Sequence, residues 1–309
     1  MKHKRVLITG ISGGLAHQVA EMIPKNWDIV GLGLNSLRPV KGRKVEHHRV
    51  DITKSKLEDI FRRRQFDCVI HMAINDNPRL PIQERHNINV IGTMKLLDAC
   101  ERYDVKKVVL LSSATVYGAN PNNPVYITED YPLRVIQRYS EISDKVEFDI
   151  YCRSWMYKHP NISTIILRPC HVIGSHVRNN FTNYLRLQYI PIPLGFDPMI
   201  QVIHEIDMAR AIIACLRYDR GGIYNVVGPG ELPLTEIINI IGGLPLPVPY
   251  TLGYYALKAS WLIGIGSLPA PQLEYLMYPC VIDGHSFEKD FHFKPQLTLN
   301  ETLRATVLY

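Results

Sequence analysis

Short apolar runs alternate with longer amphipathic stretches through the first half of the chain. The runs at 67–72 and 105–112 are almost continuously apolar, which is typical of strands in a parallel sheet covered on both faces. The stretch 84–103 instead places Ile88, Ile91 and Leu96 at helical spacing. These patterns follow one another in βαβ order and predict an α/β fold with a doubly wound parallel sheet and right-handed crossovers. The predicted strands are 6–8, 28–32, 45–50, 67–72, 105–112 and 163–168, and the predicted helices are 15–22, 55–64, 84–103 and 141–158.

The pattern changes after Arg168, where prolines break the chain into short pieces. A helix is predicted at 205–218, and one more strand at 222–227 is expected to return to the sheet. We therefore predict a first domain at 1–169, joined by 199–228, and a smaller, mainly helical substrate-binding domain at 170–309. The apolar stretch 251–266 contains Lys258 and is too short to span a bilayer. It is interpreted as a buried amphipathic helix, with contact to a membrane surface as the alternative.

Composition favours a cytosolic globular protein. The chain has 309 residues, 46% of them hydrophobic, which is enough for a large core. Its formal net charge is +6, and basic clusters such as 38–44 and 62–64 fit a solvated face or an anionic small ligand. No basic–aromatic stripe is present, which disfavours nucleic acid as a partner. The six cysteines are scattered without a Cys-x-x-Cys, so neither a metal site nor a disulfide framework is predicted, and no signal peptide is expected.

A glycine-rich turn separates the first strand from the first helix. Gly10 permits the tight turn, Gly13 leaves room for a pyrophosphate, and the small Ala16 lets the helix pack close to the strand. The free N–H groups at the start of the helix would then face the phosphates. A turn that merely needs glycine is the alternative, but the position between a strand and a helix favours phosphate binding. The expected binding residues are Gly10, Ser12, Gly13, Gly14, Leu15 and Ala16.

Motifs spread over residues 5 to about 228 resemble, in the same order, those of one family. The segment 9–16 is similar to its glycine motif, 111–118 is a close match to a Ser-Ser-x-x-Val-Tyr-Gly segment, and 167–174 resembles an Arg-Pro-x-x-Val-Tyr-Gly segment. The stretches 50–52, 69–73, 89–93, 201–209 and 223–226 resemble further motifs. The family is that of the extended short-chain dehydrogenase/reductases of the NAD(P)-dependent epimerase/dehydratase type, whose fold is Rossmann-type. The last third of the chain matches only loosely.

The resemblance implies an NAD(P) site built from the ends of several strands. Asp51 and Ile52 correspond to the turn that holds the adenine, and Met72 and Ala73 to a strand end that lines the cofactor. His171 stands where many members have a substrate-contacting asparagine, and the alternative is a structural histidine. Arg168 is interpreted as structural. The other implied cofactor-binding residues are Asn89, Ser112, Lys145 and Pro169.

The family transfers a hydride to or from a nicotinamide while a tyrosine takes or gives the substrate's hydroxyl proton. Here Ser113 and Lys145 match the serine and the lysine, but Glu141 stands where the tyrosine belongs. On a helix, positions 141 and 145 lie about 40° apart and positions 139 and 145 about 120° apart, so Tyr139 would substitute only if the helix begins after it. The predicted catalytic residues are Ser113, Glu141 and Lys145. An ordinary exposed Glu–Lys helix pair is the alternative for the last two.

The end of the second strand bears on the choice between NAD and NADP. Gly33 replaces the acidic residue that usually binds the adenosine ribose, so no carboxylate would repel a 2′-phosphate. The basic residues Arg38, Lys41 and Arg43 follow. This arrangement favours NADP over NAD, unless the basic residues only form a solvated loop.

By resemblance, the chain would act on a nucleotide-sugar or another hydroxyl-bearing metabolite by epimerisation, dehydration or oxidoreduction. The family also implies a homodimer formed through the helices 84–103 and 141–158. The missing tyrosine leaves a non-catalytic NAD(P)-binding sensor or assembly protein as the alternative. The predicted partner is a small-molecule substrate, with neither nucleic acid nor a membrane involved.

Overall fold

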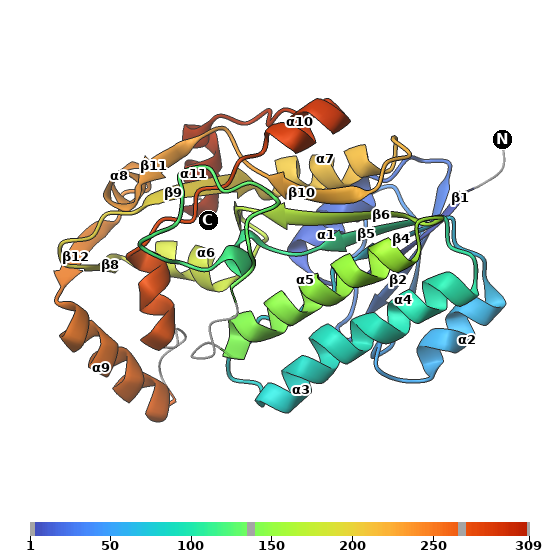
Figure 1. Cartoon of the computed structure of the whole chain (residues 1–309), viewed down its shortest axis with the longest axis horizontal. Coiled ribbons are helices and arrows are strands. Elements are labelled where there is room, and N and C mark those ends of the chain that lie inside the picture. The colour runs from blue at the N-terminus through green and yellow to red at the C-terminus, as the bar shows by residue number, and fades with distance from the viewer. Residues whose placement is uncertain (1–3, 135–139, 265–269, 308–309) are drawn as a thin grey trace.

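The computed structural model describes residues 4–134, 140–264 and 270–307. A large parallel sheet with helices on both faces forms one part of the molecule, and two small sheets with short helices form the other (Figure 1). The chain enters the second part after residue 169 and returns once to the large sheet. Within these described ranges, no helix is both long and apolar enough to cross a membrane.

The large sheet contains seven strands in the order β10-β6-β5-β4-β1-β2-β3, and every neighbouring pair runs parallel. The predicted doubly wound, Rossmann-type sheet is therefore confirmed, with each predicted strand within two residues of its observed ends. The strand order reverses between β1 and β4, and ligands of such sheets bind beside this switch point. The strands are β1 (Lys4–Thr9), β2 (Trp27–Gly33), β3 (Val45–Arg49), β4 (Cys68–His71), β5 (Lys107–Leu111), β6 (Ser163–Pro169) and β10 (Gly222–Val226).

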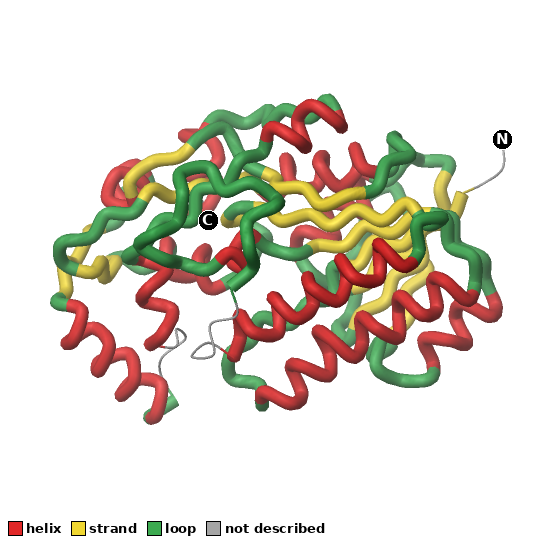
Figure 2. The backbone as a smooth tube through the Cα atoms, viewed as in Figure 1, coloured by secondary structure: helices red, strands yellow, loops and turns green. Residues whose placement is uncertain are grey.

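Helices lie on both faces of the large sheet (Figure 2). Alternate side chains of the strands pack against these two helical layers. Val6 and Ile8 face the layer of α1 (Gly14–Met22), α7 (Glu205–Cys215) and α10 (His285–Phe291). Leu7 between them faces the layer of α2 (Lys56–Arg63), α4 (Gly92–Arg102) and α5 (Ser140–Lys158). Burial on both faces explains why the strands are apolar runs rather than alternating sequences.

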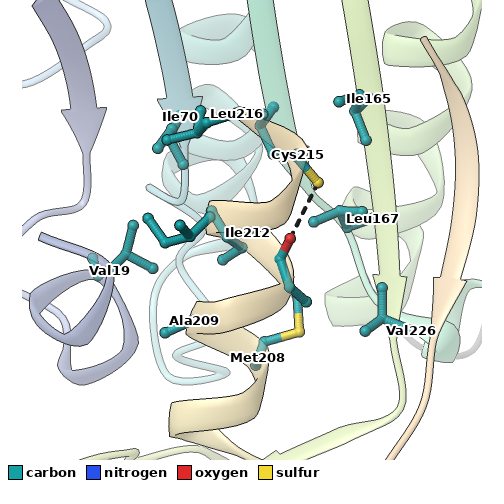
Figure 3. Close-up of a cluster of buried hydrophobic side chains, with 14 of the residues drawn as sticks. Val19, Ile70, Ile165, Leu167, Met208, Ala209, Ile212, Cys215, Leu216 and Val226 are labelled. Atoms are coloured by element: carbon teal, nitrogen blue, oxygen red, sulfur yellow. Dashed lines mark hydrogen bonds between the residues drawn. The ribbon is translucent and has the colours of Figure 1, made fainter. Parts of the chain in front are cut away.

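Helix α7 fills the core between α1 and the edge of the sheet that contains β6 and β10. Figure 3 shows Ile212 of α7 lying between Val19 of α1 and Leu167 of β6. The Cys215 thiol on the same helix donates a hydrogen bond to the Ala211 carbonyl at 3.3 Å, and burial raises its pKa. All six cysteines are free thiols, and only Cys280 is not fully buried.

The second part of the molecule contains more strand than the predicted helical domain. One small sheet has the order β11-β9-β7 and the other pairs β12 with β8. Strand β10 returns to the large sheet, whereas β9, also within 199–228, belongs to a small one. The domain boundaries themselves stay a prediction. The elements are β7 (His171–Ile173), α6 (Asn180–Leu185), β8 (Tyr189–Pro193), β9 (Met199–His204), β11 (Glu231–Pro233), α8 (Leu234–Ile240), β12 (Leu244–Val248), α9 (Tyr250–Leu262) and α11 (Leu299–Val307).

The prediction that residues 251–266 form a buried helix is wrong about burial. The helix present there is α9, none of whose residues is buried, and residues 265 and 266 lie outside the described part of the chain. Tyr254 and Leu257 pack partly on the core of the second part, while Leu252 and Leu262 on the same helix are 63% and 78% exposed. Because the apolar residues of α9 are spread around the helix rather than gathered on one side, its sequence does not indicate which side has a neighbour.

The long helix predicted at 84–103 is divided into three pieces. Helix α3 (Ile82–His86) passes through a π-helical turn, Asn87–Ile91, into α4. Inside this turn the Asn89 side chain accepts a hydrogen bond from the Asn75 N–H at 2.7 Å and donates one to the Asn75 carbonyl at 3.0 Å. Local π-turns often accompany functional sites. This one holds the loop that follows β4.

A fully buried ion pair joins α5 to the carboxyl end of β6. The Arg168 guanidinium donates to both carboxylate oxygens of Asp149, at 2.6 and 3.0 Å, and neither side chain is exposed. Burial alone would lower the pKa of Arg168, but the hydrogen bonds and charge of Asp149 outweigh it and raise that pKa. The prediction that Arg168 is structural agrees with this geometry.

Replacing Asp149 with alanine is expected to lower the free energy of unfolding by about 3–5 kcal/mol, because the Arg168 charge would stay buried without its partner. Urea denaturation followed by circular dichroism measures the change. Glu147→Ala on the same helix is the control: Glu147 is 53% exposed and its loss should cost less than about 0.5 kcal/mol. Equal, small effects of both substitutions would contradict the structural role of the pair.

Candidate functional site

A cavity of about 330 Å³ opens at the carboxyl edge of the large sheet, beside the switch point. One wall comes from the ends of β4, β5 and β6 together with α1 and α5, and the facing wall comes from residues 171–184 and 275–276. The structure therefore brings together residues that are far apart in the sequence. Eight predicted site residues line this cavity: Leu15, Met72, Asn89, Ser112, Ser113, Lys145, Pro169 and His171.

The glycine turn adjoins the cavity at Leu15. Gly10 has a φ of +71°, and a Cβ there would lie 2.8 Å from the Met72 carbonyl oxygen, so both the conformation and the close approach of β4 require glycine. Gly13 is different, because it has an extended backbone and only the Gly10 carbonyl, at 3.3 Å, lies near its missing Cβ. This open side of Gly13, at the start of α1, fits a pyrophosphate.

The segment 174–176 closes over the other side of the turn. A Cβ on Gly14 would lie 2.1 Å from the His176 carbonyl oxygen, so no side chain fits at position 14. The His176 imidazole is held by the buried Glu205 carboxylate, with an Nδ1–Oε1 distance of 2.9 Å. A ligand of the turn must therefore approach on the Gly13 side. Of the other predicted residues here, Ser12 is partly buried and Ala16 packs in the core.

Two serines at the end of β5 have different environments. The Ser112 hydroxyl donates to Asp149 at 2.6 Å and so belongs to the network of the buried ion pair. The Ser113 oxygen accepts hydrogen bonds from the Thr115 N–H at 3.2 Å and the Thr115 hydroxyl at 2.9 Å. Both bonds use the Ser113 oxygen as acceptor, which leaves its own proton to donate toward a ligand in the cavity.

Lys145 reaches the cavity from α5 and forms an ion pair with Asp76, with an Nζ–Oδ1 distance of 3.0 Å. Asp76 belongs to the loop after β4, which Asn89 holds. Glu141 is the second residue of α5, one helical turn before Lys145, and its side chain lies outside the described part of the structure. Tyr139 also lies outside the described residues. The geometry therefore tests neither alternative for the tyrosine position.

His171 lies in the facing wall and stacks on Phe181, with ring centroids 4.1 Å apart and an interplanar angle of 21°. Burial, together with the nearby positive charge of Lys145, lowers the pKa of His171 to about 4. The imidazole is therefore neutral at pH 7. Because this side chain lines the cavity, it is placed to contact a ligand.

Beyond the glycine turn, three predicted cofactor residues, Asp51, Ile52 and Ala73, do not line the cavity. The Asp51 carboxylate accepts hydrogen bonds from the Thr53 N–H and hydroxyl, both at 2.8 Å, and thereby shapes the turn after β3. Ile52 is buried in the core, and the Ala73 N–H donates to the Thr9 hydroxyl at 3.3 Å. All three follow the carboxyl ends of strands, on the side where a dinucleotide would extend from the glycine turn.

The basic residues that the sequence analysis assigned to NADP binding do not all lie in the same part of the structure. The Arg43 guanidinium donates to the carbonyls of Pro24 and Trp27, which lie at the beginning of β2 and away from the cofactor edge. Arg49 was missed by the sequence analysis. It pairs in register with Gly33, and its Nε donates to the Leu34 carbonyl at 3.1 Å. Strand register, which the sequence did not reveal, places this cation beside Gly33.

Sequence reasoning also missed the aromatic residues of the facing wall. Phe181, Tyr184 and Tyr275 line the cavity, and the Tyr275 hydroxyl donates to the Thr115 carbonyl at 3.2 Å. Tyr275 belongs to a 3-10 helix, Ala270–Leu276, in the loosely matching last third of the chain. Nothing in the local sequence signals its position beside β5.

Comparisons with known proteins identify the family. The sequence model of the NAD dependent epimerase/dehydratase family matches residues 6–227. UDP-glucose 4-epimerase of Dictyostelium discoideum is 34% identical over 256 residues, which cover 69% of this chain and 71% of that protein. An uncharacterized protein of Mycobacterium tuberculosis is 28% identical over 311 residues, covering 96% of this chain and 82% of that protein. The chain therefore belongs to the NAD-dependent epimerase/dehydratase family.

Solved structures share the fold over nearly the whole chain. UDP-glucose 4-epimerase from Bifidobacterium longum, in complex with NAD⁺ and UDP, has a TM-score of 0.75 and 22% identity, covering 98% of this chain and 97% of that chain. UDP-glucuronic acid 4-epimerase from Bacillus cereus, in complex with UDP-glucuronic acid and NAD, has a TM-score of 0.76 and 18% identity, covering 98% of both chains. These structures also cover the segment after residue 227, which the family model does not reach.

Proposed function

We propose that the chain is an NAD(P)-dependent enzyme that exchanges a hydride with a hydroxyl-bearing small molecule. The observation that carries the proposal is the single cavity that joins Ser113 and Lys145 to the edge of the glycine turn. The open side of Gly13 fits the pyrophosphate of a dinucleotide. Family membership and the NAD-bound structures of similar fold support the same cofactor class.

Each residue has a role that follows from its position. The Ser113 proton is free to bind the reacting oxygen of the substrate. Lys145, which pairs with Asp76 in the structure, would exchange this partner for the ribose of the cofactor. Glu141, one turn earlier on α5, is the proposed proton acceptor, because a carboxylate is ionised near neutral pH. When bound, NAD(P) supplies the hydride acceptor or donor.

A non-catalytic NAD(P)-binding sensor is the second candidate. It is favoured by the absence of the family tyrosine from position 141, whereas the placement of Ser113 and Lys145 favours an enzyme. Turnover by the native protein discriminates between the two. Product formation, together with the absorbance of reduced nicotinamide, would measure it with a broad panel of alcohols and nucleotide-sugars.

Gly13→Val is expected to abolish measurable dinucleotide binding, because a branched side chain would fill the space meant for the pyrophosphate. The backbone at Gly13 is extended, so valine is compatible with folding. Titration calorimetry with NAD(H) and NADP(H) measures the loss. Gly253→Ala is the control, since a Cβ there makes only ordinary contacts of 3.4 Å or more. Unchanged binding by the valine variant would refute the site, and no binding by the native protein would refute the function.

Glu141→Gln is expected to lower turnover by about 100-fold or more, since this is the usual contribution of a positioned general base. Dinucleotide affinity should change less than about twofold. Glu147→Gln, an exposed carboxylate on the same helix, is the matched control and should retain native turnover. Native turnover in Glu141→Gln would exclude proton transfer by this residue.

We also propose that the cofactor is NADP rather than NAD. Gly33 offers no carboxylate to repel a 2′-phosphate. Arg49 is exposed beside this end of β2, and Arg38 is exposed in the segment that follows β2. Gly33→Asp is a poor test, because a Cβ at this position would lie 2.7 Å from the Ser12 hydroxyl oxygen. Arg49 provides a cleaner one.

Arg49→Ala is expected to weaken NADP binding about tenfold and to leave NAD binding within about twofold, because only NADP carries the phosphate that the guanidinium would pair with. Calorimetric titrations of both cofactors provide the comparison. Arg43→Ala removes an equal charge at the opposite end of β2 and should alter neither affinity. The proposal fails if the native protein binds NAD more tightly than NADP, or if Arg49→Ala weakens both equally.

We further propose a cytoplasmic homodimer. The free thiols fit a reducing compartment, and Ile82 of α3 and Ile150 of α5 are 60% and 50% exposed on the helices that the family implies at the interface. Light scattering should give twice the 35.4 kDa mass of the chain, and Ile150→Glu should give the monomer. A native monomer at micromolar concentration would contradict the proposal.

A further inference from the structure

Helix α9 has two apolar faces, and only one of them is covered. Tyr250, Tyr254 and Leu257 are half-buried and pack on the core of the second part of the molecule. The exposed apolar positions lie on the opposite side, because with 3.6 residues per turn they fall within a stripe about 120° wide. Surface helices normally present polar residues to water, so an apolar outer face is typical of an interaction site. The stripe consists of Leu252, Tyr255, Ala256, Ala259, Leu262 and Ile263.

The strand pair that precedes α9 also has an exposed apolar face. Strands β8 and β12 bury Ile190 and Ile192 on one face. Pro249 alone separates β12 from α9, and Figure 1 shows the strand pair and the helix at the same end of the molecule, away from the large sheet. The exposed residues of the pair are Tyr189, Pro191, Leu244 and Leu246. We call these residues, together with the stripe of α9, the outer apolar surface.

The charges near this surface are positive. Between Glu236 and Glu274 the sequence contains no acidic residue, and its one charged residue is Lys258. Lys258 is exposed, about 40° around α9 from Leu262 at the edge of the stripe. The Arg79 guanidinium, from the loop after β4, lies 4.5 Å from the ring of Trp261 and adds a second cation beside the helix.

The acidic residue that follows this segment lies on the covered side of α9. Glu274 is half-buried in the 3-10 helix Ala270–Leu276, which packs against α9. A Cβ on Gly253 of α9 would lie 3.6 Å from the Leu273 side chain of that 3-10 helix. The stripe faces the other way, so its chemistry is apolar and aromatic with a basic border.

We propose that the outer apolar surface docks on a bilayer that contains anionic lipids. Leucine and isoleucine side chains enter the boundary between headgroups and acyl chains, as in helices that lie in the plane of a membrane surface. Tyrosine and tryptophan rings are favoured at headgroup depth, where Tyr189 and Tyr255 would lie. Lys258 would then meet lipid phosphates. This departs from the expectation that no membrane is involved and adopts the alternative given for residues 251–266.

Charge argues against a second copy of the chain as the occupant. In a two-fold contact the same surface meets itself. Lys258 and Arg79 of one copy would then approach those of the other, and residues 237–273 supply no carboxylate to separate them. An anionic lipid surface complements the same cations.

Sedimentation of the full-length protein with lipid vesicles tests the proposal. Vesicles of phosphatidylcholine with about 30 mol% phosphatidylglycerol are compared with vesicles of phosphatidylcholine alone. The protein is expected to bind the anionic vesicles about fivefold or more tightly, and added NaCl should weaken this binding because salt screens surface charge. Equal affinity for both vesicles, or binding to neither, would overturn the proposal.

Two substitutions with matched controls locate the contact. Tyr255→Glu should weaken binding to the anionic vesicles about tenfold or more, because it puts a carboxylate where a ring meets the headgroups. Tyr157→Glu on α5 is the control, since both tyrosines are 66% exposed. Lys258→Ala should weaken binding about fivefold, and Lys289→Ala, an exposed lysine of α10, should have no effect. Vesicle binding that Tyr255→Glu leaves unchanged would overturn the proposal.

Light scattering distinguishes lipid from a second copy as the occupant. The lipid proposal expects Tyr255→Glu to leave the mass of the protein in solution unchanged. Self-association that Tyr255→Glu abolishes, in a protein that binds no vesicles, would instead assign the outer apolar surface to contact between copies. Circular dichroism of each variant confirms that the fold is retained, as expected for substitutions at exposed positions.

Discussion

The buried ion pair between Arg168 and Asp149 is the interaction on which the geometry of the site depends. Asp149 also accepts the hydrogen bond of Ser112, which precedes Ser113 at the end of β5. On α5, Lys145 lies one turn before Asp149 and therefore on the same face of the helix. A single carboxylate thus fixes both the strand end that presents Ser113 and the helix face that presents Lys145. The Arg168 guanidinium extends this network to the Tyr117 hydroxyl and the Glu129 carbonyl.

Buried polar groups hold the sheet edge at a second point as well. His71 at the end of β4 is bonded to the hydroxyls of Thr9 and Thr93, at 2.6 and 2.8 Å, and burial lowers its pKa to about 3. The neutral imidazole ties β4 to β1 beside the glycine turn and to α4. A buried pair adds little net stability, because desolvation offsets its attraction, but a displaced partner is very costly. Such contacts allow few alternative arrangements, which suits a site built from several strand ends.

The parts of the site that sequence reasoning predicted share one property, which is that local patterns determine them. The apolar strands, Gly10, Gly13 and the carboxyl ends that carry Met72 and Ser113 follow from periodicity and from the topology of a parallel sheet. Arg49, Phe181 and Tyr275 were not predicted, because strand register and the folding of a loosely matching segment bring them to the site. The error about α9 has the same origin. Its apolar residues are spread around the helix, and only its neighbours determine which side is covered.

This division between local and non-local determinants also separates the two halves of the cavity. The cofactor half uses backbone, glycine and strand ends, which any chain with this sheet must provide in nearly the same form. The substrate half comes from residues 171–184 and 275–276, which lie outside the large sheet. The topology of that sheet therefore does not determine which side chains stand at these positions. The family match over residues 6–227 includes residues 171–184 but not 275–276, so it covers the whole cofactor half and only part of the substrate half.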